Sequence, residues 1–391
     1  MPDCDSLVPR TESASDRLTR MGERAEAQRI PLRGLIETTF RCPLRCAHCY
    51  CCEDGRPIPA YAGREGPSRE GHEGIGHEGH EELSTDAWKR VLDDLAAAGC
   101  LELVVTGGEP LVRPDWAELL AHAVRDRFAV TLFTGGTLID AAAADRIAGL
   151  GLVTVEMTMH AADRRVFESI ARVPGSYDRF LRGVELLRER GVPLLLKCVL
   201  MRANAEAYGG VADFARAVGA RVRYGVELSP RNDGDARPLA LRMTGAQTEA
   251  WFRSDVPGPF AGYARETPEA MRAKTICAAG TTTFAINPYG DVFPCNQLLI
   301  PVGNVRERPF RSIWLDAPSP FLERLRGVRT FGDLPGCAGC TLAYACRRCH
   351  GVAHLETGDW LAKSPLACEM AGIMDRIAGG TGERLEQKQA E

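Results

Sequence analysis

Short apolar segments alternate with amphipathic segments over the middle of this 391-residue sequence, and this alternation restricts the chain to few folds. The apolar segments have the length of buried strands, and the amphipathic segments have the length of helices. Helical crossovers of this kind join the strands of a parallel sheet. The expected strands cover residues 32–40, 101–105, 129–133, 153–159, 193–200 and 221–228.

Six strand and helix units are fewer than the eight of a closed TIM-type barrel. The sequence therefore predicts an α/β fold in which residues 31–230 form an open partial (β/α)6 barrel. Ser84 or Thr85 can cap the first expected helix. Because sites in parallel sheets form at the carboxyl ends of the strands, functional residues are expected there. The expected helices cover residues 85–98, 116–127, 139–150, 177–190 and 205–218.

The first expected strand leads into three cysteines at the spacing CxxxCxxC, namely Cys42, Cys46 and Cys49. Three thiolates on one short loop suit zinc or an iron–sulfur cluster, but such sites normally have four protein ligands. The spacing therefore predicts a metal centre with one position left for a ligand from elsewhere.

The second expected strand ends in Gly107, Gly108, Glu109 and Pro110. Two glycines let the backbone approach a ligand closely, and the glutamate can accept hydrogen bonds from a cation such as an amino group. A Gly-Gly turn after a strand is common by itself. Its combination with an upstream CxxxCxxC loop is specific.

With these two motifs the sequence resembles the radical S-adenosylmethionine (SAM) enzymes, from about residue 34 to about residue 368. The resemblance implies that Cys42, Cys46 and Cys49 bind a [4Fe–4S] cluster whose fourth iron is chelated by the amino and carboxylate groups of SAM. It also implies that the reduced cluster splits SAM to give a 5′-deoxyadenosyl radical, which abstracts hydrogen from an unreactive carbon. A reductant such as flavodoxin or ferredoxin would be a partner.

The same resemblance implies the residues that contact SAM. Gly107, Gly108 and Glu109 match the segment that holds the SAM amino group. The turn after the third expected strand contains Thr134 and Gly135, and Gly135 stands where the family usually has asparagine. Thr134 is therefore the remaining candidate for the ribose contact.

Two more positions follow from the resemblance. Arg172 resembles the basic position near the SAM carboxylate. His160 stands where many relatives have an acid, and a structural role and a chemical role are both open for it.

Seven further cysteines gather toward the C-terminus, around an expected hairpin with arms 284–288 and 291–294. They resemble the loop-rich SPASM extension of peptide- and protein-modifying radical SAM enzymes, expected here at residues 277–370. The alternative for Cys337 and Cys340 is a structural zinc knuckle. The seven are Cys277, Cys295, Cys337, Cys340, Cys346, Cys349 and Cys368.

The ligand pattern of that extension implies two auxiliary [4Fe–4S] clusters, and therefore three clusters in the chain. Auxiliary cluster I would take Cys277, Cys295 and Cys349, which leaves one iron open. His350 is the alternative to Cys349, because the last gap of the dense run is two residues here and three in the family. Auxiliary cluster II would take Cys337, Cys340, Cys346 and Cys368.

A Gly-, Glu- and His-rich insertion at residues 53–82 interrupts the barrel sequence and is expected to be a mobile surface loop. Adventitious metal binding by His72, His77 and His80 is its alternative role. The other expected segments are a loose arm or short covering helix at 1–30, a linker with a bridging helix at 231–276, and a C-terminal tail at 371–391.

Charge and hydrophobicity exclude several classes of partner. The formal net charge of -4 does not indicate the excess of basic residues that binding to nucleic acid or to an anionic membrane requires. No apolar run reaches the roughly 18 to 20 residues of a spanning helix, and no signal peptide is evident. The sequence therefore predicts a cytoplasmic protein.

The leading functional prediction is maturation of a ribosomally made peptide by a cross-link, a thioether or another C–H functionalisation. Asn296 follows Cys295 where anaerobic sulfatase-maturating enzymes have an aspartate, and an amide cannot act as that general base. The partner would be a precursor peptide, and the 1–30 arm is too short for a leader-binding domain. Either a separate small protein binds the leader, or the substrate binds directly in the groove between barrel and extension. Alternatives are a radical SAM enzyme acting on a tetrapyrrole or other small molecule, and a non-catalytic iron–sulfur electron carrier. No catalytic acid or base is predicted.

Overall fold

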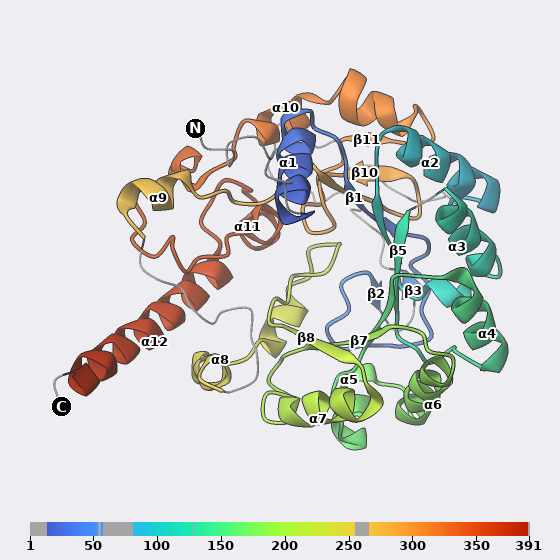
Figure 1. The fold of residues 1–391 in the computed structure, drawn as a ribbon, viewed down its shortest axis with the longest axis horizontal. Helices are drawn as coiled ribbons and strands as arrows, with labels where there is room; N and C mark the ends of the chain where they lie inside the picture. Colours follow the sequence, from blue (N-terminus) through green and yellow to red (C-terminus); the bar gives the residue numbers. More distant parts are fainter. Residues whose placement is uncertain (1–13, 54–55, 58–80, 127, 255–265, 390–391) are drawn as a thin grey trace, which may run out of the picture.

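A nine-stranded open sheet forms the centre of the molecule, with the strand order β11-β10-β9-β1-β4-β5-β6-β7-β8 (Figure 1). The structure is a computed structural model that describes residues 14–53, 56–57, 81–126, 128–254 and 266–389. The six predicted barrel strands are all present and parallel, as β1 (Arg33–Glu37), β4 (Glu102–Thr106), β5 (Ala129–Thr134), β6 (Thr154–Thr158), β7 (Leu194–Val199) and β8 (Arg221–Gly225).

Helices cover the outer face of these strands (Figure 1). The Ser84 side chain caps the first of them by accepting a hydrogen bond from the Ala87 amide. One helix, α5 (Arg164–Ala171), was not predicted. The predicted ones are α2 (Thr85–Ala97), α3 (Trp116–Arg125), α4 (Ala141–Leu150), α6 (Ser176–Glu189) and α7 (Tyr208–Val218).

The two faces of the sheet differ in chemistry. Apolar side chains such as Val155 and Leu196 belong to the core on the helical face. On the opposite face, Lys197 lies 3.7 Å from Glu156, and its ammonium lies 3.0 Å from the centre of the Phe133 ring. Burial lowers the pKa of Lys197 to about 7. The inner face of the open barrel is therefore partly polar.

The predicted C-terminal hairpin is present as β9 (Thr283–Ile286) and β10 (Asp291–Phe293). It is also part of the barrel sheet, because β9 pairs in parallel with β1 and β10 pairs with β11 (Gly303–Asn304). The contact is tight: a Cβ at Gly34 would lie 2.4 Å from the Phe284 ring. The cysteine-rich extension is thus joined to the strand that precedes the CxxxCxxC loop.

The described part of the N-terminal arm is a covering helix, α1 (Ala14–Ala27). The chain just after it is held to the C-terminal region, because Trp314 Nε1 donates to the Arg29 carbonyl at 3.0 Å and Arg29 pairs with Glu323 at 2.8 Å. At the start of the insertion, β2 (Cys52–Glu53) pairs antiparallel with β3 (Arg56–Pro57). His72, His77 and His80 lie outside the described residues.

The segment expected as a linker is ordered where the structure describes it. The Asn232 amide donates to the Tyr50 carbonyl at 2.8 Å, so this segment contacts the end of the cysteine loop. The long α12 continues past residue 370, the expected boundary between the extension and the tail. The remaining elements are η2 (Pro110–Val112), η3 (Arg237–Leu241), α8 (Gly245–Phe252), α9 (Pro268–Ala273), η4 (Ser312–Asp316), α10 (Pro320–Arg326), η5 (Phe331–Asp333), α11 (His350–Thr357) and α12 (Pro365–Gln389).

Among the described residues, no helix is both long and apolar enough to span a bilayer.

Candidate active site

The CxxxCxxC loop follows β1 and is held against the end of α5. The Arg45 amide donates to the Ala171 carbonyl at 3.1 Å, and the Ala47 amide donates to the Ile170 carbonyl at 2.9 Å. The helix that sequence reasoning missed therefore fixes the backbone on both sides of the second cysteine, Cys46.

Cys42, Cys46 and Cys49 lie together, since each interacts electrostatically with another member of the group. Burial raises the pKa of Cys42 to about 12 and raises the pKa of Cys46 further above its ordinary value. Thiols with raised pKa values stay protonated without metal, and coordination removes the proton. Three converging soft ligands fit an iron–sulfur cluster with one open iron.

The Gly-Gly-Glu turn at the end of β4 is bound to the backbone of this loop. The Gly108 amide donates to the Thr39 carbonyl at 2.7 Å, and the Glu109 amide donates to the Arg41 carbonyl at 2.9 Å. A Cβ at Gly108 would lie 2.6 Å from the Phe40 and Arg41 oxygens. The sequence predicted that the backbone at this turn approaches a ligand closely. In the structure it closely approaches the cysteine loop.

Glu109 is buried and links the ends of β4 and β5. Its carboxylate accepts hydrogen bonds from the Thr134 hydroxyl at 2.9 Å, the Gly135 amide at 2.7 Å and the Leu111 amide at 3.1 Å. Burial raises the pKa of Glu109 against the effect of these donors. Three donors leave one of about four acceptor directions of a carboxylate for a further donor, such as an ammonium group. Thr134 itself points at Glu109.

Gly135 stands where the family usually has asparagine, and the structure shows little room for a side chain there. A Cβ would lie 3.1 Å from Leu44 and 3.3 Å from Glu109 Oε2. Arg172 ends α5 in the left-handed conformation, with φ of 55°. Burial raises the pKa of Cys46 and the positive charge of Arg172 opposes that rise, so Arg172 lies near the cluster loop.

His160 is buried directly behind the cysteine loop. Its Nε2 lies 3.6 Å from Cys46 Sγ. Burial, and next the charge of His48, lower the pKa of His160 to about 3. Sequence reasoning singled out this residue but did not predict its contact with a cysteine.

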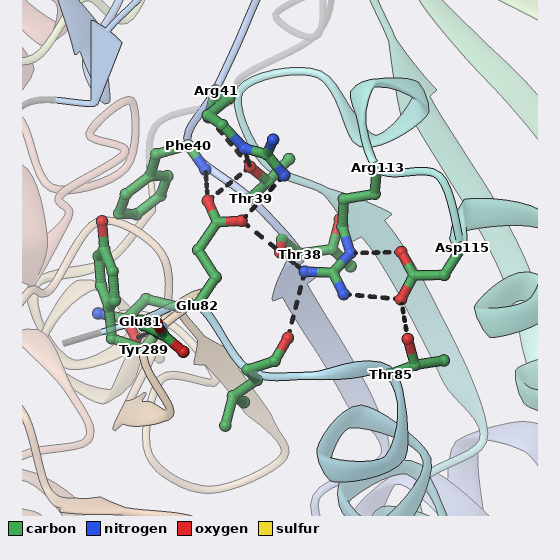
Figure 2. A network of polar contacts seen from close by, with 12 residues as sticks. Thr38, Thr39, Phe40, Arg41, Glu81, Glu82, Thr85, Arg113, Asp115 and Tyr289 are labelled. Atoms are coloured by element: carbon green, nitrogen blue, oxygen red, sulfur yellow. Dashed lines mark hydrogen bonds and ion pairs between the residues drawn. The ribbon is translucent and has the colours of Figure 1, made fainter.

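A polar network that the sequence did not predict holds the start of the loop (Figure 2). Glu82, the last residue of the insertion, accepts hydrogen bonds from the Thr39 hydroxyl at 2.6 Å and the Phe40 amide at 3.2 Å. Arg113 donates to the Thr38 carbonyl at 3.0 Å and pairs with Asp115 at 2.7 Å. A glutamate after a low-complexity segment carries no sequence signal for such a role.

The first C-terminal group contains Cys277, Cys295 and Cys349. Burial raises the pKa values of Cys277 and Cys295, and the charge of Cys349 raises them further. Backbone amides donate to two of the sulfurs, Leu298 N to Cys295 at 3.3 Å and Val352 N to Cys349 at 3.5 Å.

Of the two alternatives for the last ligand, the structure brings Cys349 to this group. The other alternative, His350, is buried with its Nδ1 3.1 Å from the Trp360 carbonyl. Burial lowers the pKa of His350 to about 4.

The second C-terminal group contains Cys337, Cys340, Cys346 and Cys368. Burial raises the pKa of Cys346 to about 12, and the charges of the other three raise it further. Arg348 is buried beside both groups: its Nη2 donates to the Trp360 and Ala362 carbonyls, each at 2.6 Å, and its neighbours include Cys337 and Cys349. A four-thiol group fits an iron–sulfur cluster or zinc.

Comparison with known families matches the same two regions. Residues 36–215 match the radical SAM superfamily, and residues 277–350 match the iron–sulfur cluster-binding SPASM domain. Cys368 lies beyond the second match. The two matches together cover more than half of the chain.

Curated relatives span nearly the whole chain. An AdoMet-dependent heme synthase of Methanosarcina barkeri is 26% identical over 84% of this chain and 94% of its own length. A PqqA peptide cyclase of Granulibacter bethesdensis is 29% identical over 90% of this chain and 92% of its own length.

Among solved structures, SuiB of Streptococcus suis bound to its precursor peptide SuiA superposes with a TM-score of 0.61 at 16% identity. The superposition covers 94% of this chain and 84% of SuiB, and it shows a shared fold. The fold, the two cysteine regions and the two family matches agree. The chain is a radical SAM enzyme with a C-terminal SPASM domain.

Proposed function

We propose that this enzyme matures a ribosomally made peptide by radical chemistry. The observation that carries the proposal is the similarity to PqqA peptide cyclases, which extends over 90% of the chain. The fold shared with SuiB, a protein solved with a precursor peptide, supports it.

In this proposal Cys42, Cys46 and Cys49 hold the SAM-binding cluster. When bound, the cluster and SAM supply a 5′-deoxyadenosyl radical that abstracts a hydrogen atom from the peptide. Glu109 accepts a hydrogen bond from the SAM ammonium through its remaining acceptor direction. Gly107 and Gly108 keep that carboxylate next to the cysteine loop.

Two other residues complete the proposed SAM site. Thr134 orients Glu109 through their hydrogen bond. Arg172, near Cys46, supplies a positive charge for the SAM carboxylate.

The seven C-terminal cysteines hold two auxiliary [4Fe–4S] clusters in this proposal, which makes three clusters in the chain. Cys277, Cys295 and Cys349 serve the first, and Cys337, Cys340, Cys346 and Cys368 serve the second. The first has three cysteine ligands and one open iron. Anaerobic reconstitution is expected to yield about twelve iron atoms and twelve sulfides per chain. An iron content near four per chain would contradict the presence of the auxiliary clusters.

The proposed partners are a precursor peptide, a separate small leader-binding protein and a reductant of the flavodoxin or ferredoxin type, in the cytoplasm. Nucleic acid has no part in this proposal. Tight binding of a precursor leader to the isolated enzyme would remove the need for the leader-binding protein.

The test combines product analysis with a matched variant. Reconstituted enzyme, SAM and a strong reductant are incubated with short peptides encoded beside its gene, and the peptide mass and 5′-deoxyadenosine are measured. A peptide product that has lost two hydrogen atoms, formed in proportion to the 5′-deoxyadenosine produced, supports the proposal. Glu109→Gln should keep its iron and raise the KM for SAM at least about tenfold, the equivalent of about 1.4 kcal/mol.

A tetrapyrrole substrate is the second candidate, favoured by the similarity to AdoMet-dependent heme synthase over 84% of the chain. The same assay includes a porphyrin with carboxylate side chains as substrate. Turnover of the porphyrin with unmodified peptides would overturn peptide maturation in favour of this candidate.

A further inference from the structure

His160 follows β6 at the carboxyl end of the sheet, and its ring is held on several sides. Its ring centre lies 5.0 Å from that of Phe167 and 5.3 Å from that of His48. Its carbonyl accepts a hydrogen bond from Asn204 Nδ2 at 2.8 Å. Only 2% of the residue is exposed. The ring therefore has one orientation relative to the cysteine loop.

This orientation aims Nε2 at Cys46, with 3.6 Å between Nε2 and Sγ. The other ring nitrogen, Nδ1, is buried and has no hydrogen-bond partner among the described residues. A cysteine sulfur that binds a metal has lost its proton and can only accept. With Cys46 as a cluster ligand, the contact therefore requires a hydrogen on Nε2.

We propose that His160 is a positioning residue that donates a fixed N–H···S hydrogen bond to the Cys46 thiolate and so stabilises the reduced cluster. The inference rests on the proposed cluster ligands Cys42, Cys46 and Cys49. Hydrogen bonds to cluster sulfurs are one of the factors that set reduction potential, because a donor favours the more electron-rich state.

The donor at this site differs in kind from those of the first C-terminal group. There, the backbone amides of Leu298 and Val352 donate to cysteine sulfurs. A backbone donor stays when its side chain is replaced. The donor to Cys46 is a side chain, so a substitution removes it while the backbone of the cysteine loop stays intact.

The test is the reduction potential of the SAM-binding cluster in the reconstituted full chain, measured by EPR-monitored titration with and without SAM. His160→Phe keeps a ring and removes the donor, and its potential should become more negative. His160→Gln restores an N–H donor and should return the potential toward the wild-type value. Gly149→Ala, at a position where nothing lies within 4 Å of an added Cβ, is the control and should leave the potential unchanged.

A wild-type potential in His160→Phe with full iron content would overturn the inference. If that variant does not assemble, wild-type protein labelled with ¹⁵N-histidine gives an independent answer. Nitrogen coupling to the reduced cluster that persists in His48→Gln supports the hydrogen bond, and absence of coupling in the wild type overturns it. Absence of iron or of SAM cleavage in the wild type would instead contradict the proposed function.

Discussion

The two cysteine regions of the molecule gather the same kind of ligand in opposite ways. Cys42, Cys46 and Cys49 lie on one loop after one strand. The seven C-terminal cysteines come from the hairpin region, from turns and from α12, spread from residue 277 to residue 368. The first site therefore depends on how one loop is held, and the others depend on the packing of a whole domain.

The charges around the two regions also differ. In the N-terminal region burial raises the pKa values of Cys42 and Glu37, and the charges of Glu109 and Cys49 add to these rises. Arg172 is the cation that opposes the rise in the pKa of Cys46. In the C-terminal region burial raises the pKa of Cys277, and the charges of Arg329 and Arg348 oppose that rise. Lys274 and Lys363 act likewise on Cys346 and Cys368. Since cations stabilise electron-rich states, we expect the auxiliary clusters to be reduced more easily than the SAM-binding cluster.

The largest effect is expected for Gly108→Ala, which tests how the cysteine loop is held. The added Cβ would lie 2.6 Å from two backbone oxygens of the loop, so the Gly108 and Glu109 hydrogen bonds must break. We expect a loss of about 3 kcal/mol or more in unfolding free energy. Iron should be lost from the N-terminal site and retained in the C-terminal sites, as measured by iron analysis and EPR.

Gly149→Ala is the matched control, because nothing lies within 4 Å of a Cβ at that position of α4. A helical glycine replaced by alanine should stabilise the protein by roughly 0.5 to 1 kcal/mol. Full iron at the N-terminal site in Gly108→Ala would show that the backbone contact does not hold the loop.

The next effect concerns the carboxylates of the N-terminal region in the metal-free protein. Burial raises the pKa of Glu37 to about 7, although the Tyr50 hydroxyl donates to it at 2.6 Å. As the pH rises from about 4.5 through about 7, the carboxyl of the unfolded chain ionises first. The folded state should therefore lose up to about 3 kcal/mol of stability over this range.

Denaturant unfolding of the metal-free protein at pH 5 and pH 8 measures this loss. Glu37→Gln should remove most of the difference between the two pH values. An equal pH dependence in the variant and the wild type would mean that Glu37 is not the buried acid responsible.

Arg348→Gln tests the cationic side of the comparison. The guanidinium is buried beside Cys337 and Cys349, and removing its charge should destabilise reduced auxiliary clusters. A contribution of about 1.4 kcal/mol corresponds to about 59 mV for one electron. Redox titration should show more negative auxiliary potentials and an unchanged SAM-binding cluster, whereas Arg348→Lys should shift them less. Equal shifts of all clusters would refute a local charge effect.

The smallest effect is expected for Glu82→Gln, in the network of Figure 2. The amide oxygen can still accept from Thr39 and Phe40. The ion pairs with the half-exposed Arg41 and, at 3.8 Å, with Arg113 are lost, but Arg113 keeps its pair with Asp115. A loss below about 1 kcal/mol is expected. Glu82→Ala leaves both donors unpaired and should cost about 1 to 3 kcal/mol. Thermal unfolding compares the two, and equal losses would show that the charge, not the acceptor, is what holds the loop.

The sequence predicted the six barrel strands and the C-terminal hairpin because each is a local pattern of apolar residues and turns. The missed helix α5 has only eight residues and begins with two arginines, so no long apolar period marks it. The pairing of β9 with β1 joins segments far apart in the chain, and neither segment encodes its partner.

Prediction of the site shows the same division. The cysteine spacings and the Gly-Gly-Glu turn are readable as local motifs. The contacts of His160 with Cys46 and of Glu82 with Thr39 are fixed by tertiary packing, so no spacing in the sequence signals them. The placement of Cys349 beside Cys277 and Cys295, and of His350 against Trp360, likewise follows from the fold.

The most direct test of the central claim is SAM cleavage by three single variants, Cys42→Ala, Cys46→Ala and Cys49→Ala. Each is reconstituted anaerobically beside the wild type, reduced, and assayed for 5′-deoxyadenosine. We predict cleavage by the wild type and none by any variant, while the C-terminal iron signals remain. Continued 5′-deoxyadenosine formation in any of the three would contradict a SAM-binding cluster on this loop.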